Sequence, residues 1–395
     1  MSHQATQFKA HDSFKTFILN GEIERFCADR VQTQKTLFRK LKLLCALKAS
    51  LWQQGCRYPD NAFHIVGSTL NGFGENDSDL DITILLLNKC RTRIEAIREL
   101  NNLKKYWRQL SVVRTIDVLE CKVPILRMSF WYPFTDLTVD VNINNVATTY
   151  STYLLWKYAM VDHRVRMLFM VVKNWAKNRG LNDTRNGTFS TYSLALMVIH
   201  YLQCGAEPAI LPEVDVIWQK VNCEPQSWST QNTTPIGNLL IGFFDYFANK
   251  FDYRKEAINI RLGKRVSREE VVTWTGFKSQ WQSICIQEPF MLSNAASSIY
   301  NEDTFAFIRG EFKQSYQELI RTTNLRHLLN FTVRSYRKII KKHIHPGGIV
   351  SVVQLVPTSY SATRVPVQVN PALYVLPPTP ISAEPFPQKC VQNRS

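Results

Sequence analysis

Residues 63–68 read Phe63-His64-Ile65-Val66-Gly67-Ser68, and residues 79–85 read Asp79-Leu80-Asp81-Ile82-Thr83-Ile84-Leu85. The first stretch is typical of a buried strand that ends at a Gly-Ser turn, and the second of a strand that begins with two carboxylates. Residues i and i+2 of a strand point to the same face, so Asp79 and Asp81 are expected to project together, about 7 Å apart along the chain. Two carboxylates on one face can hold hard cations.

A Gly-Ser turn and a third carboxylate would complete such a site. Gly67 lets the backbone approach a ligand closely, and Ser68 adds a hydroxyl beside amides that bind phosphate oxygens. Residues 137–143 alternate apolar and polar side chains, which predicts a further strand that carries Asp140. Acidic pairs and Gly-Ser steps also occur in solvated loops, but their combination with two apolar strands favours a nucleotidyl-transfer site.

Composition limits the class of protein. With 395 residues, of which 45% are hydrophobic, the chain is long enough for two domains with real cores. Its formal net charge of +16 favours a polyanionic partner, either nucleic acid or an acidic membrane surface. The carboxylate site makes RNA or DNA the better expectation.

The sequence also indicates a compartment. We find no apolar run near the ~20 residues of a membrane span and no signal-peptide core, so we expect no membrane association. The nine cysteines are scattered and never form Cys-x-x-Cys. They are interpreted as free thiols in a reducing compartment, which predicts a cytoplasmic protein, with nuclear access left open.

The first half of the chain predicts a small mixed α/β sheet. Residues 13–53 have apolar side chains at three- and four-residue steps, which indicates helical structure. A further helix is expected over residues 91–110, and strands over 112–118 and 123–130. Basic residues interleave with the first helical pattern, and we expect them on a solvated face, with a basic edge beside the cleft as the alternative: Lys35, Arg39, Lys40, Lys42 and Lys48.

From Tyr153 onward the pattern becomes helical. Residues 164–178 are amphipathic, with Lys173 and Lys177 one turn apart on the polar face. Further helices are expected over 194–202, 236–247 and 301–342, with a strand-like segment at 257–260. Nine of the seventeen prolines lie in the last fifty residues, which predicts a disordered tail beyond Pro346.

Four motifs carry a resemblance to a known family: Val66-Gly67-Ser68-Thr69-Leu70-Asn71-Gly72-Phe73-Gly74, Val172-Lys173-Asn174-Trp175-Ala176-Lys177, Gly187-Thr188-Phe189-Ser190-Thr191-Tyr192-Ser193 and Ile286-Gln287-Glu288-Pro289-Phe290. The chain resembles the DNA polymerase beta nucleotidyltransferase superfamily. Within it, the chain is similar to cytoplasmic poly(A) RNA polymerases of the germline-development type and to their terminal uridylyltransferase relatives. The resemblance covers about residues 30–340.

The resemblance implies the fold class and the domains. It implies an α/β fold in which a small mixed-sheet nucleotidyltransferase domain and a mostly helical PAP-associated central domain hold the nucleotide in the cleft between them. We therefore expect an N-terminal helical segment at 1–35, the catalytic domain at 36–148, the central domain at 149–345 and the Pro-rich tail at 346–395.

Roles for individual residues also follow from the resemblance. Asp79, Asp81 and Asp140 would be catalytic and would bind two Mg²⁺ or Mn²⁺ ions. The residues expected to bind the nucleotide are Gly67, Ser68, Lys173, Lys177, Ser190, Thr191, Tyr192 and Asn294. Without the resemblance, the lysine pair would be a solvent-facing feature and the two hydroxyls would be helix caps. The resemblance implies that Tyr192 stacks on the base, whereas without it Tyr192 would be an ordinary core residue.

The choice of base is inferred from one position. Uridylating relatives carry His where this chain has Asn294, so Asn294 indicates ATP, with a simple turn residue as the alternative. The chain departs from the family pattern at Met291, where an acidic residue is usual, and at Ser151, where Asn is usual. The first departure concerns the contacts to the base, and the second the contact to the ribose.

The resulting hypothesis is template-independent addition of AMP from ATP to RNA 3′ ends. The alternatives are a terminal uridylyltransferase and a catalytically inactive RNA-binding scaffold of the same fold. Because the sequence shows no separate RNA-recognition module, we expect an RNA-binding adaptor protein to supply target specificity.

Overall fold

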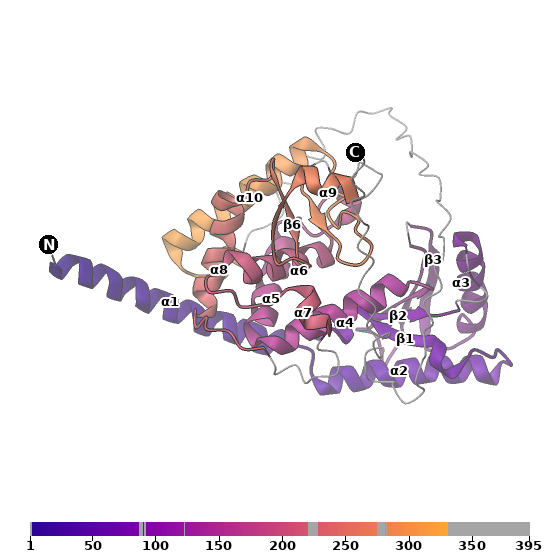
Figure 1. Ribbon diagram of the computed structural model, residues 1–395. Helices are drawn as coiled ribbons and strands as arrows, with labels where there is room; N and C mark the ends of the chain where they lie inside the picture. The colour runs from indigo at the N-terminus through magenta and orange to yellow at the C-terminus, as the bar shows by residue number, and fades with distance from the viewer. Residues whose placement is uncertain are drawn as a thin grey trace, which may run out of the picture.

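The computed structural model describes residues 2–86, 90, 92–121, 123–219, 228–274, 281 and 283–330. The predicted Pro-rich tail and the end of the last predicted helical segment lie outside these residues. Figure 1 shows a sheet flanked by helices at one end of the molecule and a larger, mostly helical body at the other. No helix in these ranges is both long and apolar enough to cross a bilayer.

The first body is built on a mixed five-stranded sheet. Its strands are β1 (Phe63–Val66), β2 (Leu80–Ile84), β3 (Val113–Leu119), β4 (Ile125–Phe130) and β5 (Thr138–Ile143). They lie in the order β1-β2-β5-β4-β3, with β2 and β5 parallel and the other neighbours antiparallel. The carboxylate-bearing strands β2 and β5 are therefore interior strands.

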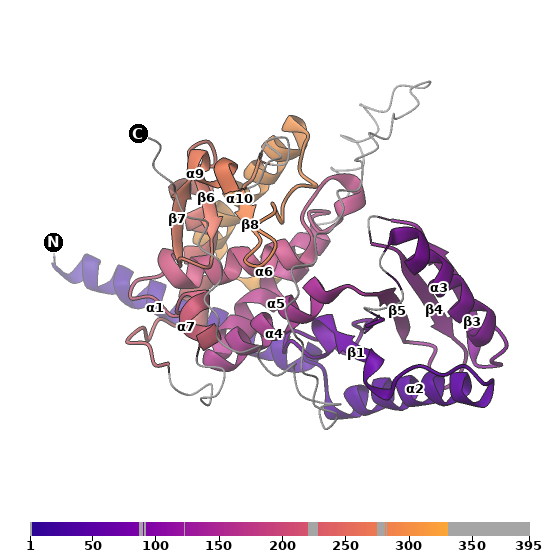
Figure 2. The ribbon, with the colours of Figure 1, turned by 45° about the vertical axis from the view of Figure 1, so that its right-hand side comes forward.

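Two helices cover one face of this sheet. They are α2 (Gln34–Gln53) and α3 (Arg93–Trp107), and Figure 2 shows α3 along β4 and β3. Leucines of α2 pack in one core with the inward residues of every strand. The indole Nε1 of Trp107 donates to the carbonyl of Leu47 at 3.0 Å, which joins the two helices.

The helical structure predicted for residues 13–53 is confirmed, but it is divided between two helices. The structure has two helices, α1 (Ser2–Arg30) and α2, which begins at the N-cap Thr33. The amide of Thr33 donates to Asn76 Oδ1 at 2.9 Å, so a contact from another part of the chain fixes the break. Helix α1 packs on the helical body, where Glu22 accepts hydrogen bonds from Asn324 Nδ2 and the amide of Leu325.

The helical body contains α4 (Val146–Val161), α5 (His163–Asn178), α6 (Thr191–His200), α7 (Val214–Gln219), α8 (Ile236–Asp245), α9 (Arg268–Trp274), α10 (Glu302–Thr322) and α11 (Leu325–Leu329). Single π-helical turns, Tyr201–Gly205 and Tyr246–Lys250, follow α6 and α8. A small sheet of β6 (Glu256–Asn259), β7 (Lys264–Ser267) and β8 (Ile286–Gln287) has the order β7-β6-β8. Only β6 was expected from the sequence.

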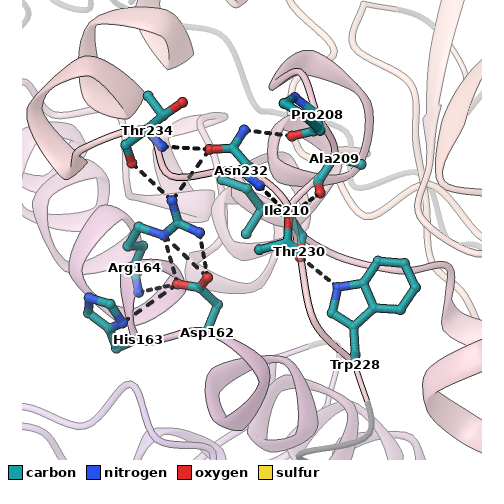
Figure 3. A network of polar contacts seen from close by, with 10 residues as sticks. All are labelled: Asp162, His163, Arg164, Pro208, Ala209, Ile210, Trp228, Thr230, Asn232 and Thr234. Carbon is teal, nitrogen blue, oxygen red and sulfur yellow. Dashed lines mark hydrogen bonds and ion pairs between the residues drawn. The ribbon is translucent and has the colours of Figure 1, made fainter.

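A buried polar network fixes the loops beside α5. Asp162 caps the helix and holds the Arg164 guanidinium at 2.6 Å (Figure 3). Arg164 also donates to the carbonyl of Thr234 at 2.9 Å. Asn232 in the same loop donates to the carbonyl of Pro208, so two loops are tied to the start of α5, the helix that carries Lys173 and Lys177.

Candidate active site

The structure brings the three predicted carboxylates together. Asp81 on β2 lies directly opposite Asp140 on β5 in the parallel register. Asp79 comes one residue before β2, and its carboxylate is hydrogen-bonded to the side chain of Thr138 at the start of β5. Two segments far apart in the sequence thus supply one acidic cluster.

The cluster carries strong mutual repulsion. Burial, followed by the charges of Asp140 and Asp79, raises the pKa of Asp81 to about 7. Burial and the charge of Asp140 also raise the pKa of Asp79, while Arg127 and Lys40 oppose the shift. A cation placed here would relieve this repulsion.

Gly67 sets the approach of the turn to the acidic cluster. Its φ is 69°, and a Cβ built on it would lie 2.5 Å from Asp81 Oδ2, so a side chain fits neither the backbone nor the space. The amide of Gly67 donates to Thr152 Oγ1 of α4 at 2.8 Å. Ser68 follows in the same turn and is half-buried.

Lys40 is the residue that sequence reasoning placed wrongly. It was expected on a solvated face, but it is fully buried, and its Nζ donates to Gln32 Oε1 at 2.8 Å and to Thr69 Oγ1 at 3.3 Å. Burial lowers its pKa to about 8, against the opposing charges of Asp81 and Asp79. The signal was present, because position 40 falls at helical spacing from the buried leucines Leu43, Leu44 and Leu47.

Thr69 connects Lys40 to the main chain of Asp79. Its hydroxyl accepts from Lys40 and donates to the main-chain carbonyl of Asp79 at 3.2 Å. Lys40 therefore lies behind the site and supports both the turn and the start of β2.

Arg127 was not identified from the sequence. It lies on β4 in register with Asp140 and contacts both carboxylate oxygens, Nε to Oδ1 at 2.8 Å and Nη2 to Oδ2 at 2.5 Å. In the described ranges, no group of three His, Cys, Asp or Glu side chains is arranged to hold a metal ion, and both oxygens of Asp140 contact Arg127. The donor set nonetheless fits a hard divalent cation, because it consists of carboxylate oxygens.

The two predicted lysines of α5 occupy different positions. Lys173 Nζ lies 2.6 Å from Glu75 Oε1, and Asn174 Nδ2 donates to the other oxygen of Glu75 at 3.1 Å. Glu75 precedes β2 and is buried, so this contact joins the two bodies beside the carboxylates. Lys177 lies one turn further along α5 and is exposed.

The hydroxyls at the start of α6 make local contacts. Ser190 caps the helix, and its Oγ accepts from the amide of Ser193 at 2.9 Å, which is the helix-cap role expected without the resemblance. Thr191 is exposed and donates to Asn182 Oδ1. Tyr192 donates from its hydroxyl to Glu288 Oε1 at 2.8 Å, so its ring is fixed between α6 and the loop after β8.

Asn294 has the loop role that the sequence analysis kept as its alternative. Its Oδ1 accepts from the amides of Ile286 and Ala296 at 3.0 and 2.9 Å, and its Nδ2 donates to the carbonyl of Ile284 at 2.8 Å. The side chain is buried and is used to close the loop. The preference for ATP therefore receives no support from this position.

Comparisons with known proteins agree with this geometry. A family model described as "Poly(A) RNA polymerase, mitochondrial-like, central palm domain" matches residues 19–160, and one described as "Cid1 family poly A polymerase" matches residues 235–294. Poly(A) RNA polymerase gld-2 of Caenorhabditis elegans is 35% identical over 349 residues, 73% of this chain and 31% of that protein. Poly(A) RNA polymerase GLD2 of Homo sapiens is 31% identical over 292 residues, 69% of this chain and 59% of that protein.

Solved structures give the same fold. The GLD-2/RNP-8 complex matches with a TM-score of 0.70 and 35% identity, covering 80% of this chain and 99% of that chain. Cid1 in complex with the UTP analog UMPNPP matches with a TM-score of 0.64 and 22% identity, covering 78% and 94%, and at that identity it shows the fold alone. The predicted fold class is confirmed. The chain spans only 31% to 59% of the length of the two curated relatives.

Proposed function

The chain belongs to the Cid1 family of poly(A) polymerases and, within it, to the GLD-2 type, and from this premise we propose that it adds AMP from ATP to the 3′ ends of RNA. The observation that supports the proposal most is the pairing of Asp81 with Asp140 across β2 and β5, with Asp79 beside them. In the scaffold alternative nothing would require these three carboxylates to share one cluster.

The carboxylates would hold the metals of the reaction. Asp79 and Asp81 would bind both cations, and Asp140 the one nearest the acceptor. Bound Mg²⁺ or Mn²⁺ supplies positive charge for the leaving pyrophosphate and lowers the pKa of the attacking hydroxyl. Arg127 must release an oxygen of Asp140 for this, which its side chain, 42% exposed, has room to do.

The residues around the carboxylates would position the triphosphate. The Gly67 turn brings main-chain amides and the Ser68 hydroxyl next to Asp81. Lys173 would exchange Glu75 for phosphate oxygens, and Lys177 would add charge from the exposed end of α5. Ser190 and Thr191 lie at the N-terminus of α6, where amides favour an anion, and Tyr192, held by Glu288, would stack on the base.

ATP is proposed as the donor because the named relatives at 31% to 35% identity are poly(A) RNA polymerases. RNA is proposed as the acceptor, and the net charge of +16 suits its phosphate backbone without specifying sequence. We also propose an adaptor protein, since GLD-2 has been solved as a complex with RNP-8 and with GLD-3. A cytoplasmic location belongs to the same proposal, and the free thiols of the described cysteines suit it.

The test is to incubate the purified chain with a 5′-labelled single-stranded RNA, Mg²⁺ and each nucleoside triphosphate separately. The proposal predicts extension with ATP that far exceeds extension with UTP, GTP or CTP. Extension mainly with UTP would make the protein a terminal uridylyltransferase. If no nucleotide extends the RNA, whether the RNA is free or tethered to the protein, the inactive RNA-binding scaffold is the remaining interpretation.

A further inference from the structure

The sheet has an open face that continues from the carboxylates to the outer strand β3. Along β4, Leu126, Met128 and Phe130 are fully buried beneath α3, so the alternate residues Arg127 and Ser129 point the other way. Arg127 contacts Asp140, and Ser129 lies in register with Thr138. The face that carries the acidic cluster therefore extends over β4.

A row of hydroxyls follows this face. Thr138 is hydrogen-bonded to Asp79, and Ser129 pairs with Thr138 in the sheet register. The hydroxyls of Ser129 and Thr115 on β3 lie 2.6 Å apart, and Thr115 is exposed. Side chains that can both donate and accept hydrogen bonds thus lead from the metal-binding carboxylates to the edge of the sheet.

An exposed aromatic and a cation lie at the end of this row. Trp131, the first residue after β4, is 53% exposed, and its neighbour Tyr132 is 88% exposed. The guanidinium carbon of Arg114 on β3 lies 5.1 Å from the centroid of the Trp131 ring. Aromatic faces beside cations are the usual components of sites for single-stranded nucleic acid.

The residues expected to bind the triphosphate and this face lie on opposite sides of the acidic cluster. The Gly67 turn contacts Asp81 from the β1 side, and Lys173 approaches from α5, whereas β4 and β3 lie beyond Asp140 on the other side. In phosphoryl transfer the attacking oxygen approaches roughly in line with and opposite the leaving group. With pyrophosphate leaving near the turn, the acceptor strand must approach over β4 and β3.

We propose that this face, defined by Arg114, Thr115, Arg127, Ser129 and Trp131 and called the acceptor track below, binds the 3′-terminal nucleotides of the acceptor RNA, an assignment that rests on the proposed function. A base stacks on Trp131, the two guanidiniums contact backbone phosphates, and the hydroxyls contact the sugars. None of these contacts reads a base edge, so the face binds single-stranded RNA of any sequence and leaves target choice elsewhere.

The test uses two variants and a matched pair of controls. Trp131→Ala and Arg114→Glu remove the stacking surface and the charge, while Trp52→Ala and Arg57→Glu make the same changes in a second exposed pair, where Arg57 lies 3.7 Å from the Trp52 ring at the end of α2. We expect each track variant to raise the KM for a short single-stranded RNA roughly tenfold. The KM for ATP and the Tm should stay unchanged, and both controls should match wild type.

Two results would overturn the inference without touching the proposed function: an RNA KM within about twofold of wild type in both track variants, or an equal loss in the control pair. If the wild type adds no nucleotide, the proposed function fails. The RNA-binding role of the acceptor track is then tested by itself, from the affinity of each variant for labelled RNA measured by fluorescence anisotropy. Weaker RNA binding in the track variants alone would then support it, and equal binding in all variants would reject it.

Discussion

Asp81 on β2 and Asp140 on β5 lie directly opposite each other across a parallel strand pair. Burial, followed by the charges of Asp140 on the neighbouring strand and of Asp79, raises the pKa of Asp81, so both segments contribute to the site. Replacing Asp79, Asp81 or Asp140 singly by Ala should abolish nucleotide addition while each variant still unfolds in one cooperative thermal transition. The exposed Asp29, changed to Ala, is the matched control. Activity within a fewfold of wild type in any one of the three would reject the two-metal assignment.

The charge cluster also predicts a pH dependence of stability in EDTA. The pKa of Asp81 is about 7 in the folded chain and 3.8 ordinarily, so the folded state binds the extra proton between these values and wild type loses stability as pH rises through this window. Asp81→Asn removes the effect. We expect its Tm to equal that of wild type near pH 4 and to exceed it by several degrees above pH 7.

Mg²⁺ provides the complementary measurement on the same two proteins. A cation that binds only the folded chain raises its Tm, by about 2.7 kcal/mol at a hundred times its Kd. The rise should be large for wild type and small for Asp81→Asn. A Tm difference that is independent of pH in EDTA, together with equal responses to Mg²⁺, would contradict the charge cluster.

Lys40 is predicted to act on the nucleotide through the turn. Lys40→Met removes the donor to Gln32 and Thr69, so the turn that begins at Gly67 loses a restraint. We expect the KM for ATP to rise roughly tenfold, which corresponds to about 1.4 kcal/mol, while the Mg²⁺ concentration for half-maximal rate does not increase. Lys42→Met is the control, because Lys42 is exposed on the same helix. An unchanged KM for ATP would show that Lys40 serves stability alone.

Asn294 gives a prediction that separates loop closure from base reading. Both Asn294→Ala and Asn294→His leave the amides of Ile286 and Ala296 without their acceptor, which costs ~1–3 kcal/mol. The Tm should therefore fall by several degrees, while the ratio of kcat/KM for ATP to that for UTP stays constant. A ratio that moves toward UTP in Asn294→His, with an unchanged Tm, would restore the base-reading interpretation.

The sequence predicted those features that depend on the spacing of side chains along a single strand or helix. Alternation places Asp79 and Asp81 on one face, and the apolar strand around Asp140 required a neighbour, so the acidic cluster could be anticipated. The Lys40 position could also have been found, since it falls on the leucine face of α2, but a charged residue at that spacing is usually solvated.

Other contacts between distant segments could not be predicted. Arg127 meets Asp140, and Glu75 meets Lys173, only because the strand order and the packing of α5 bring them together. The break between α1 and α2 depends on Asn76 in the same way. Strand β8 is two residues long, too short for a period to appear, and β7 has only one apolar residue, Val266.

The most direct test of the central claim is the stoichiometry of the reaction, followed by mass spectrometry of the RNA and by release of pyrophosphate in one sample. Nucleotidyl transfer through Asp79, Asp81 and Asp140 predicts that the RNA gains mass in steps of one AMP and that one pyrophosphate is released for each step. Both signals should disappear together in Asp140→Ala. Phosphate release without a gain in RNA mass, or AMP addition that persists in Asp140→Ala, would contradict the account.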